Sequence, residues 1–406
     1  MIDPKDVDHA AIRRERIRKL LPRIMQEQKV GAWLTLTRES TIDPLLPVLG
    51  MEKIVARGAF LFTLEGGSLR AVAIAASYDV DPIHESGLYD EVIAYGSEGI
   101  KPHLQRVAGA LSAGSIAVNV SRDVPIADGL TAGLRAYLVE ALGDIGGRLV
   151  SSEKLVMSLL GRKLPAEIAA LEVAAETTQR ILAEALTAQR VAPGGTTEKM
   201  LDDWMRARAE ELGFGVAFGS VVVGPTRGHS DPTDRVIQRG DALRTDWGAS
   251  CAGYCADIQR MAYVLRDGEK GVPVWLERLW RATLSANRAA VAALVPGATG
   301  NDVDRAGRGG IVAAGYAEYP HGTGHAIGLK VHDVGPMLGP DWRERYGDTV
   351  FFRIEPGQVF AVEPMAYTVP GEVGYEVHAS LEEDVVVEDA GPRYLGRAQT
   401  DIILIG

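Results

Sequence analysis

The sequence predicts two domains, an N-terminal α/β domain over residues 1–155 and a duplicated α+β domain over residues 156–406. Short β-rich apolar stretches alternate with helical patterns in the first part, as in an α/β layer. In the second part, a unit of helix, Pro-Gly-x-Thr, helix and strands occurs twice, about 100 residues apart. The length of 406 residues also suits two domains.

Short apolar stretches in the first domain indicate its strands. They are Ala32–Leu36, Ala59–Thr63, Leu69–Ala75, Glu91–Ala94 and Ser115–Val120. A helical pattern over Leu104–Leu111 lies between the last two stretches. His9, His84 and His103 are isolated in this domain, and we interpret each as a surface residue. The first domain therefore carries no predicted catalytic cluster.

The sequence changes character near Ser151, and we place the domain boundary at about residue 155. A long helical pattern follows, with Pro165 in its first turn, where proline is favoured. It ends at the first Pro-Gly-x-Thr segment, residues 193–196, and a second helix begins. The apolar face of that helix comprises Leu201, Trp204, Met205 and Leu212. A later helix ends likewise at residues 296–299, and another begins at about Asn301.

The composition restricts the class of protein. Lys plus Arg total 43 and Asp plus Glu total 54, so the net charge of −11 disfavours nucleic acid as a partner. No apolar run approaches the ~18–20 residues of a membrane helix, and the N-terminus lacks the apolar core of a signal peptide. The two cysteines, Cys251 and Cys255, are too few for a disulfide scaffold. We therefore expect a soluble, cytoplasmic protein with no membrane partner.

Two aspartates flank a predicted β-hairpin in the second domain. Asp246 and Asp257 lie on stretches separated by a turn near Gly253-Tyr254. They are 11 positions apart, so an even loop centred near Cys251 would place them directly opposite each other. Paired Cβ atoms lie ~4.5–5.5 Å apart, and carboxylates this close repel unless a cation or a proton intervenes. The alternative is a pair of solvent-facing aspartates.

Three histidines fall within one short segment, at His321, His325 and His332. The glycines between them argue against a helix and let the backbone pass close to a bound group. Neutral imidazole is a common metal ligand and a general acid or base. The segment is therefore a candidate metal or catalytic site, and the alternative is a histidine-rich polar loop.

Two acidic segments follow the histidines. Glu363 ends the strand-like stretch VFAV, and Pro364 restricts the backbone and so fixes the direction of the Glu363 side chain. Further on, alternation places Glu382 and Asp384 on one face of a strand and Glu383 on the other. Periodicity does not choose between the two faces. An acidic strand edge is the alternative interpretation of this second segment.

Asp, His and Glu side chains from these separate strands would form an oxygen-rich site with one imidazole. Such sites suit divalent ions, including Mn²⁺, Co²⁺, Fe²⁺ and Zn²⁺. Four carboxylates offset the charge of two such ions. A two-metal site can hold a bridging hydroxide and polarise a carbonyl group, so the second domain is a candidate dinuclear hydrolase.

Taken together, these motifs resemble the metallopeptidase family of prolidase, aminopeptidase P and methionine aminopeptidase, whose catalytic domain has the pita-bread fold. The resemblance covers residues ~155–390. It rests on a combination of DxG, an aspartate eleven residues later, HGxGHxxGLxxH, PGxVFxVEP and an acidic strand. The N-terminal domain resembles that of prolidase and creatinase. The duplicated half-domains of the family agree with the repeated Pro-Gly-x-Thr unit.

The resemblance implies a set of metal ligands and further histidines near the substrate. The implied ligands are Asp246, Asp257, His325, Glu363 and Glu382. Glu382 is thereby chosen over its neighbour, and Asp384 becomes an outer residue. His229 matches a substrate-binding position, and His321 matches one near the bridging water. His332 matches a position that stabilises the tetrahedral intermediate and contacts the substrate.

The chain departs from the family pattern at two positions. Family peptidases usually carry Arg two residues before the last glutamate, where this chain has Ser380. They often carry Tyr before the VVVG-like strand, where this chain has Phe218-Gly219. The usual side chains support the metal site and the substrate through hydrogen bonds. We expect metal binding to survive, because the ligands are present, and the substrate preference to be affected.

The resemblance implies a dinuclear metal-dependent hydrolase that cleaves the Xaa-Pro imide bond of dipeptides by attack of a metal-bridging hydroxide. Glu363 would be the general base, and His321 would relay protons or orient water. Mn²⁺ is the expected metal, with Zn²⁺, Co²⁺ or Fe²⁺ as alternatives. The family is commonly homodimeric, and only the resemblance supports a homodimer here.

Other functions stay open at this point. An Xaa-Pro aminopeptidase (aminopeptidase P) would act on longer peptides and differs in how closed the pocket is beyond proline. A non-peptide C–N hydrolase, such as ectoine hydrolase or creatinase, shares the two-domain layout, although creatinase works without metal and lacks most of these ligands. A binding module without catalysis would typically have lost ligands, and none is lost in this sequence.

Overall fold

The structure is a computed structural model that describes residues 3–111, 114–227, 230–369 and 371–406. Contacts between residues divide the chain into two units, Asp8–Leu160 and Gly161–Gly406, and the described residues before Asp8 belong to the second. The division lies at the end of helix α6 (Glu153–Gly161). The boundary expected at about residue 155 falls within the same helix.

The unit Asp8–Leu160 is built on a six-stranded sheet of order β4-β3-β2-β1-β5-β6. The strands are β1 (Ala32–Arg38), β2 (Arg57–Glu65), β3 (Ser68–Ala76), β4 (Glu91–Tyr95), β5 (Ile116–Val118) and β6 (Leu149–Ser151). The pairs β1–β2 and β2–β3 are antiparallel, and β4, β5 and β6 are added in parallel. The first four predicted apolar stretches lie within β1 to β4, and the fifth, Ser115–Val120, contains the shorter β5. The sequence missed β6, which is short and mostly exposed.

The α-helices of this unit that precede α6 each bury apolar residues. They are α1 (His9–Glu15), α2 (Leu21–Glu27), α3 (Val80–Ser86), α4 (Lys101–Gly109) and α5 (Ala132–Leu142). Leu104 of α4 and Leu138 of α5 belong to one core with Leu34 of β1 and Val118 of β5. The helical pattern predicted over Leu104–Leu111 overlaps α4, which begins three residues earlier and ends at Gly109.

The unit Gly161–Gly406 contains two larger sheets. The first has the order β17-β10-β8-β7, with β9 paired to β8, and the second has the order β11-β12-β15-β16. The strands of the first sheet are β7 (Gly215–Val223), β8 (Ala242–Cys251), β9 (Tyr254–Cys255), β10 (Ile258–Val264) and β17 (Ile403–Ile405). Those of the second are β11 (Gly324–Ala326), β12 (Val359–Val362), β15 (Glu383–Glu388) and β16 (Gly391–Tyr394). A separate pair comprises β13 (Met365–Tyr367) and β14 (His378–Ser380).

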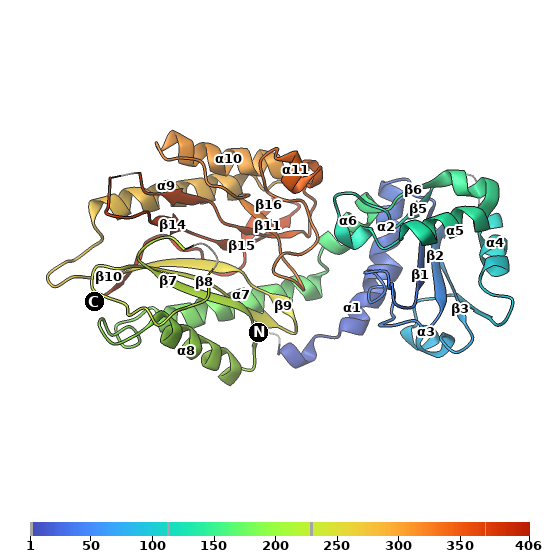
Figure 1. Cartoon of the computed structure of the whole chain (residues 1–406), viewed down its shortest axis with the longest axis horizontal. Coiled ribbons are helices and arrows are strands. Elements are labelled where there is room, and N and C mark those ends of the chain that lie inside the picture. The colour runs from blue at the N-terminus through green and yellow to red at the C-terminus, as the bar shows by residue number, and fades with distance from the viewer. Residues whose placement is uncertain (1–2, 112–113, 228–229, 370) are drawn as a thin grey trace. The chain divides into compact units, whose positions relative to one another are not determined.

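The helices of this unit cover the outer sides of the two sheets (Figure 1). The first sheet is covered by α7 (Pro165–Ala185) and α8 (Glu198–Glu211), and the second by α9 (Val274–Ala293) and α10 (Gly300–Ala313). A short helix, α11 (Arg343–Tyr346), follows later in the chain. Apolar residues of α7 and α8 share a core with β8, and those of α9 and α10 share one with β12 and β15.

The predicted internal repeat also recurs as a pattern of hydrogen bonds. In the first half, the Gly194 amide donates to the carbonyl of Ile237 at 2.8 Å. In the second half, the Gly297 amide donates to the carbonyl of Ile354, also at 2.8 Å. Each Pro-Gly-x-Thr segment therefore ties the junction between two helices to an extended segment that follows later in its own half. The mixed α+β, duplicated architecture predicted for this part is confirmed.

The hairpin that carries the two aspartates has a different register from the expected one. Strands β8 and β9 are joined at Ala252-Gly253, whose φ angles of 50° and 87° are typical of a type I′ turn. Asp246 therefore lies opposite Gln259 and not opposite Asp257. The expected direct pairing was wrong because the turn forms where Gly253 tolerates positive φ. The shift keeps both aspartates on one face, because it moves the register by an even number of residues.

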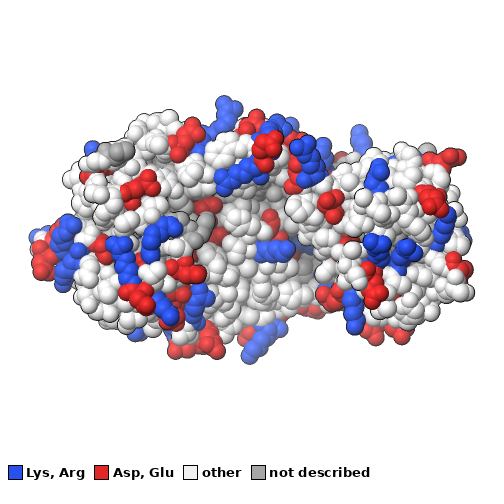
Figure 2. Space-filling model, in the orientation of Figure 1, with Lys and Arg blue, Asp and Glu red and all other residues white. Residues whose placement is uncertain are grey.

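Charged side chains of both signs are interspersed on the face of the molecule drawn in Figure 2. The net charge of −11 therefore does not gather in one continuous acidic patch on that face. Within the described ranges, no helix has both the length and the hydropathy that a bilayer span requires.

The close approach of β11 to β12 gives a first testable prediction. A Cβ atom at Gly324 would lie 2.0 Å from the carbonyl oxygen of Ala361, so Gly324→Ala must push these paired strands apart. We expect a loss of about 1–3 kcal/mol in the free energy of unfolding, as for other overpacked sites. Urea denaturation would measure it. Gly309→Ala is the matched control, because Gly309 lies on the exposed side of α10 and a Cβ there meets nothing within 4 Å, and it should be neutral or slightly stabilising. Equal stability of both variants would contradict the argument.

Candidate metal centre

A cavity of about 630 Å³ lies in the second unit, and its walls come from both halves of the repeat. All residues predicted as metal ligands line it, namely Asp246, Asp257, His325, Glu363 and Glu382. His321 and His332 line it as well. His229 lies outside the described residues. The cavity thus gathers side chains that are more than 130 residues apart along the chain.

Three of these side chains form a tight, buried group. One possible ligand atom from each of Asp257, His325 and Glu382 lies within 4.8 Å of the others. The Nε2 atom of His325 is 3.5 Å from Oδ2 of Asp257 and 3.8 Å from Oε1 of Glu363. Asp246 and Glu363 lie beside this group, and the charge of Asp246 therefore acts on both Asp257 and Glu363.

The donor atoms of this group fit divalent cations. Oδ1 of Asp257 and both carboxylate oxygens of Glu382 are buried and accept no hydrogen bond. A hydrogen bond between the two carboxyl groups would need a proton on one of them, whereas a cation satisfies both. The Nδ1 atom of His325 lies 3.2 Å from the carbonyl of Ala326, which can only accept. This contact favours a neutral ring with its Nε2 lone pair directed at the carboxylates.

Burial and mutual repulsion raise the pKa values of the carboxyl groups in the cavity. For Asp257 the pKa rises well above its usual range through burial first, and then through the charges of Asp246, Asp384 and Glu363. Burial and the same kind of repulsion raise the pKa of Glu382. Burial and the charge of Asp246 raise the pKa of Glu363 to about 8. Without cations, this site therefore holds protons that its carboxyl groups would release in water.

Strand alternation directs Asp246 into the cavity. The next residue, Trp247, is fully buried on the opposite face, where its Nε1 donates to Asp202 of α8 at 3.2 Å. Trp247 therefore points away from the cavity. Gly219, opposite Trp247 in β7, faces the same way, and a Cβ there would lie 2.5 Å from Oδ1 of Asp202. Phe218, next to a β-bulge, is the residue of this pair that lines the cavity.

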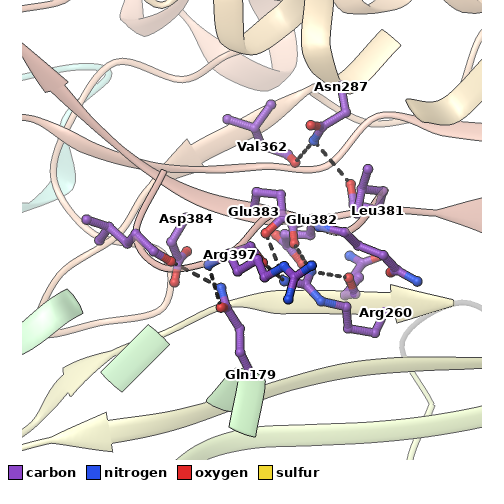
Figure 3. Close-up of polar contacts among 12 residues, drawn as sticks. Gln179, Arg260, Asn287, Val362, Leu381, Glu382, Glu383, Asp384 and Arg397 are labelled. Carbon is purple, nitrogen blue, oxygen red and sulfur yellow. Dashed lines mark hydrogen bonds and ion pairs between the residues drawn. The ribbon is translucent and has the colours of Figure 1, made fainter. Parts of the chain in front are cut away.

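A buried arginine holds the segment that carries Glu382. Nη1 of Arg260 donates to the carbonyl of Glu382 at 3.0 Å, and its Nη2 donates to the carboxylate of Glu383 at 2.9 Å (Figure 3). The Glu383 side chain is thus paired with Arg260 on the side of the strand away from the cavity, whereas the Glu382 side chain faces the cavity. Asn287 of α9 adds a bond to the carbonyl of Val362, the residue before Glu363.

Two further buried groups fix the neighbouring ligands. The carboxylate of Asp384 accepts a hydrogen bond from the backbone amide of Asp257 at 3.1 Å, so Asp384 acts on the backbone of a predicted ligand. The side-chain amide of Gln259 donates to Oε2 of Glu363 at 3.4 Å. The Glu363 amide donates to the carbonyl of Thr323 at 2.7 Å, which joins β12 to the histidine segment.

An ion pair on α10 holds the start of the histidine segment. Arg308 pairs with Asp304 at 2.9 Å and donates to the carbonyls of Tyr319 and His321, both at 2.6 Å. The hydroxyl of Thr323 donates to Asp304 at 2.8 Å. Because these groups are buried, the backbone on either side of the glycines has little freedom to move. The loop that the sequence indicated is therefore a fixed one.

Sequence reasoning missed several residues that line the cavity, including four with polar side chains on neighbouring strands. These four are Arg244, Gln259, Tyr367 and His378. Arg244 is the one with a local signal, because it is a charge within the apolar strand ALRTDWG at the same parity as Asp246. The other three lie in β10, β13 and β14, and only the tertiary fold determines that these strands border the cavity.

Comparison with known proteins gives a family for this chain. A profile of metallopeptidase family M24 matches residues 169–389, which is more than half of the chain. The probable dipeptidase PepE of Mycobacterium bovis is 31% identical over 288 residues, which cover 69% of this chain and 71% of that protein. For two other curated relatives the match covers 45% and 48% of their length, so the chain spans about half of each.

Solved structures show the same fold over nearly the whole chain. A Xaa-Pro dipeptidase from Bacillus anthracis is 22% identical, with a TM-score of 0.65 over 98% of this chain and 100% of that one. An X-Pro aminopeptidase from Thermotoga maritima is 24% identical, with a TM-score of 0.63 over 95% and 99% of the two chains. The predicted pita-bread fold is thereby confirmed. From the family profile, the similarity to PepE and this shared fold, the chain belongs to metallopeptidase family M24.

Proposed function

We propose that this chain is a dinuclear Xaa-Pro dipeptidase whose metal ligands are Asp246, Asp257, His325, Glu363 and Glu382. One observation carries the proposal: buried carboxylate oxygens of Asp257 and Glu382 accept no hydrogen bond and lie beside a histidine. Mn²⁺ is the first ion to test, because oxygen-rich sites with one imidazole suit it. The homodimer and the cytoplasmic location expected from the sequence stay predictions.

Glu363 is the proposed general base. Two divalent ions, when bound, lower the pKa of a water molecule towards neutrality and polarise the scissile carbonyl group. Glu363 lies at the end of β12, where Gln259 orients one of its oxygens and the other faces the Nε2 atom of His325. From there its carboxylate takes up the proton that the nucleophile releases and passes it to the leaving nitrogen.

Two histidines complete the proposed mechanism. The ring of His332 is stacked on that of His325, with centroids 3.8 Å apart and planes inclined by 16°, and it lines the cavity. From this position it donates to the oxyanion, a contribution often worth about 3–4 kcal/mol. The Nδ1 atom of His321 lies 2.7 Å from the carbonyl of Gly322 and so donates to it. Its Nε2 then accepts, which suits the orientation of a water molecule.

Aminopeptidase P activity on longer peptides is the second candidate. A further cavity of about 680 Å³ shares Pro320 and Tyr367 with the first. It offers room for residues that follow the proline of a substrate. The first experiment therefore compares proline release from Ala-Pro with cleavage of Ala-Pro-Ala, using purified protein and added Mn²⁺. Cleavage of the dipeptide alone supports the proposal, cleavage of the tripeptide at an equal or higher rate supports the second candidate, and no cleavage of either with Mn²⁺, Co²⁺, Zn²⁺ or Fe²⁺ rejects both.

Loss of a proposed ligand should abolish turnover. We expect Asp257→Asn and Glu363→Ala each to lower kcat/KM by well over 100-fold, more than the usual effect of a residue that only orients a ligand. Inductively coupled plasma mass spectrometry on the same preparations should show reduced bound metal. Asp389→Asn, on the exposed surface after β15, is the control for loss of one carboxylate. Near wild-type activity in either ligand variant would sink the assignment.

Stability of the metal-free protein should depend on pH in a defined direction. The pKa of Glu363 is about 8 in the fold and about 4.5 when unfolded, so the folded state binds the extra proton between these values. This contribution to stability is complete below pH ~4.5 and is lost as pH rises through about 8. Burial lowers the pKa of His378, so the contribution of His378 to stability rises with pH. That contribution is complete by pH ~6.5 and does not change above it.

Chemical denaturation of the metal-free protein between pH 6.5 and 8 tests this linkage. We expect the free energy of unfolding to fall with pH, by up to ~1.4 kcal/mol per pH unit for each extra bound proton. Glu363→Gln should make the fall shallower. Added Mn²⁺ should stabilise the protein more at pH 8 than at pH 6.5, because metal binding displaces protons. A stability that rises with pH in the metal-free protein would contradict the linkage.

A further inference from the structure

Arg244 is a buried cation in the wall of the cavity. It is the third residue of β8, between Leu243 and Thr245, which are both fully buried, and only 4% of its own surface is exposed. Its Nη2 atom donates to the backbone carbonyls of Gly224 at 2.9 Å and Pro225 at 3.3 Å. These two bonds fix the guanidinium group in one orientation, because they hold one end of a rigid plane.

The remaining donors of this guanidinium have no acceptor. Nε and Nη1 of Arg244 are buried and make no hydrogen bond. Among the described residues, no carboxylate forms an ion pair with Arg244. The nearby Glu198 is already used, since it pairs with Arg227 and accepts bonds from Thr233. A buried charge without a partner is strongly unfavourable in the free protein, so this position calls for an anion from outside the chain.

The place of Arg244 relates it to the metal centre. Arg244 and Asp246 point to the same side of β8, and residues two apart on a strand are ~6.6–6.8 Å apart. Both line the same cavity. The nearby cavity residues Thr226, Tyr367 and His378 are uncharged, and the hydroxyl of Thr226 is 2.9 Å from Nδ1 of His378. The cavity therefore has an acidic end at Asp246. Two residues back along β8 it has a cationic end at Arg244, which is surrounded by neutral hydrogen-bonding groups.

We propose that Arg244 binds the C-terminal carboxylate of the dipeptide substrate. This inference rests on the proposed function, because it needs a scissile carbonyl group at the metal end. In a dipeptide the carboxylate lies only a few bonds beyond the scissile carbon, which matches the spacing of the two ends. In a longer peptide a neutral amide takes that place and leaves the buried guanidinium unpaired. Arg244 thereby sets the preference for dipeptides.

Arg345 is the competing cation in the same cavity. It lies in α11, is exposed, and donates from Nη1 to the carbonyl of Pro320 at 2.8 Å. Its guanidinium also lies over the ring of Tyr346, 5.1 Å from the centroid. An exposed arginine is solvated by water and gains little from one more anion. The unpaired, buried position of Arg244 therefore favours it as the carboxylate-binding residue.

Substrate pairs that differ only in the carboxylate test this assignment. We would measure kcat and KM for Ala-Pro and Ala-Pro-amide with the Mn²⁺-loaded wild type, Arg244→Gln, Arg244→Lys and Arg345→Gln. The wild type should prefer the free acid by roughly 10- to 100-fold, as a charge-assisted hydrogen bond predicts. In Arg244→Gln, kcat/KM should fall for the free acid and stay unchanged for the amide, so the preference should be lost. Arg244→Lys should keep part of the preference, and Arg345→Gln should keep all of it. An equal fall on both substrates, or loss of preference in Arg345→Gln alone, would overturn the inference.

A binding measurement separates failure of this inference from failure of the proposed function. Calorimetry with L-proline and L-prolinamide needs no turnover, and the Mn²⁺-loaded wild type should bind L-proline at least 10-fold more tightly. Arg244→Gln should abolish that difference and leave the melting temperature unchanged or higher, because it removes an unpaired buried charge. Absence of Xaa-Pro cleavage, with the binding difference intact, rejects only the proposed function. Equal binding of the two probes to the wild type rejects the role of Arg244.

Discussion

The repulsion among buried carboxylates is the constraint on which the rest of the catalytic unit depends. Asp246, Asp257, Glu363 and Glu382 line one cavity, and burial together with their mutual charge raises the pKa values of the last three. Free side chains would rotate towards water to relieve this repulsion. They are prevented by bonds to the backbone beside them, such as those from Arg260, and by a proton or cation that offsets the charge.

The duplicated fold explains how so many acidic groups reach one place. The two aspartates come from the first half of the repeat, and the histidine and the two glutamates come from the second. Each half buries the outer face of its sheet beneath its own pair of helices, which leaves the inner faces to form the cavity. Neither half holds the whole group, so the geometry of the site depends on contacts between them. The bond from the Asp257 amide to Asp384 is one such contact.

The sequence was sufficient for those features that depend on local pattern. Helix and strand periodicity, the repeated Pro-Gly-x-Thr segment and the acidic and histidine positions were all visible in it. The five predicted metal ligands line the cavity, together with His321 and His332. The register of the hairpin was not visible, because it depends on where the chain can turn. The turn at Ala252-Gly253 is centred one residue beyond the expected position, which moves the pairing by two residues. The roles of Phe218 and Gly219 were hidden for a similar reason. A bulge next to Phe218 decides which of them faces the cavity.

Arg244 shows a different limit of sequence reasoning. A charge in an apolar strand is visible in the sequence, but whether it has a partner depends on carboxylates brought near by the whole fold. Among the residues that the structure describes, the nearby Glu198 already pairs with Arg227. The backbone carbonyls of Gly224 and Pro225 satisfy only one end of the Arg244 guanidinium. Ser380, fully buried in the same cavity, adds no charge to the wall. On the proposed function, electrostatics then sets the length of the substrate. The carboxylate at the end of a dipeptide offsets the charge of the buried guanidinium, as the metal ions offset the charge of the buried carboxylates.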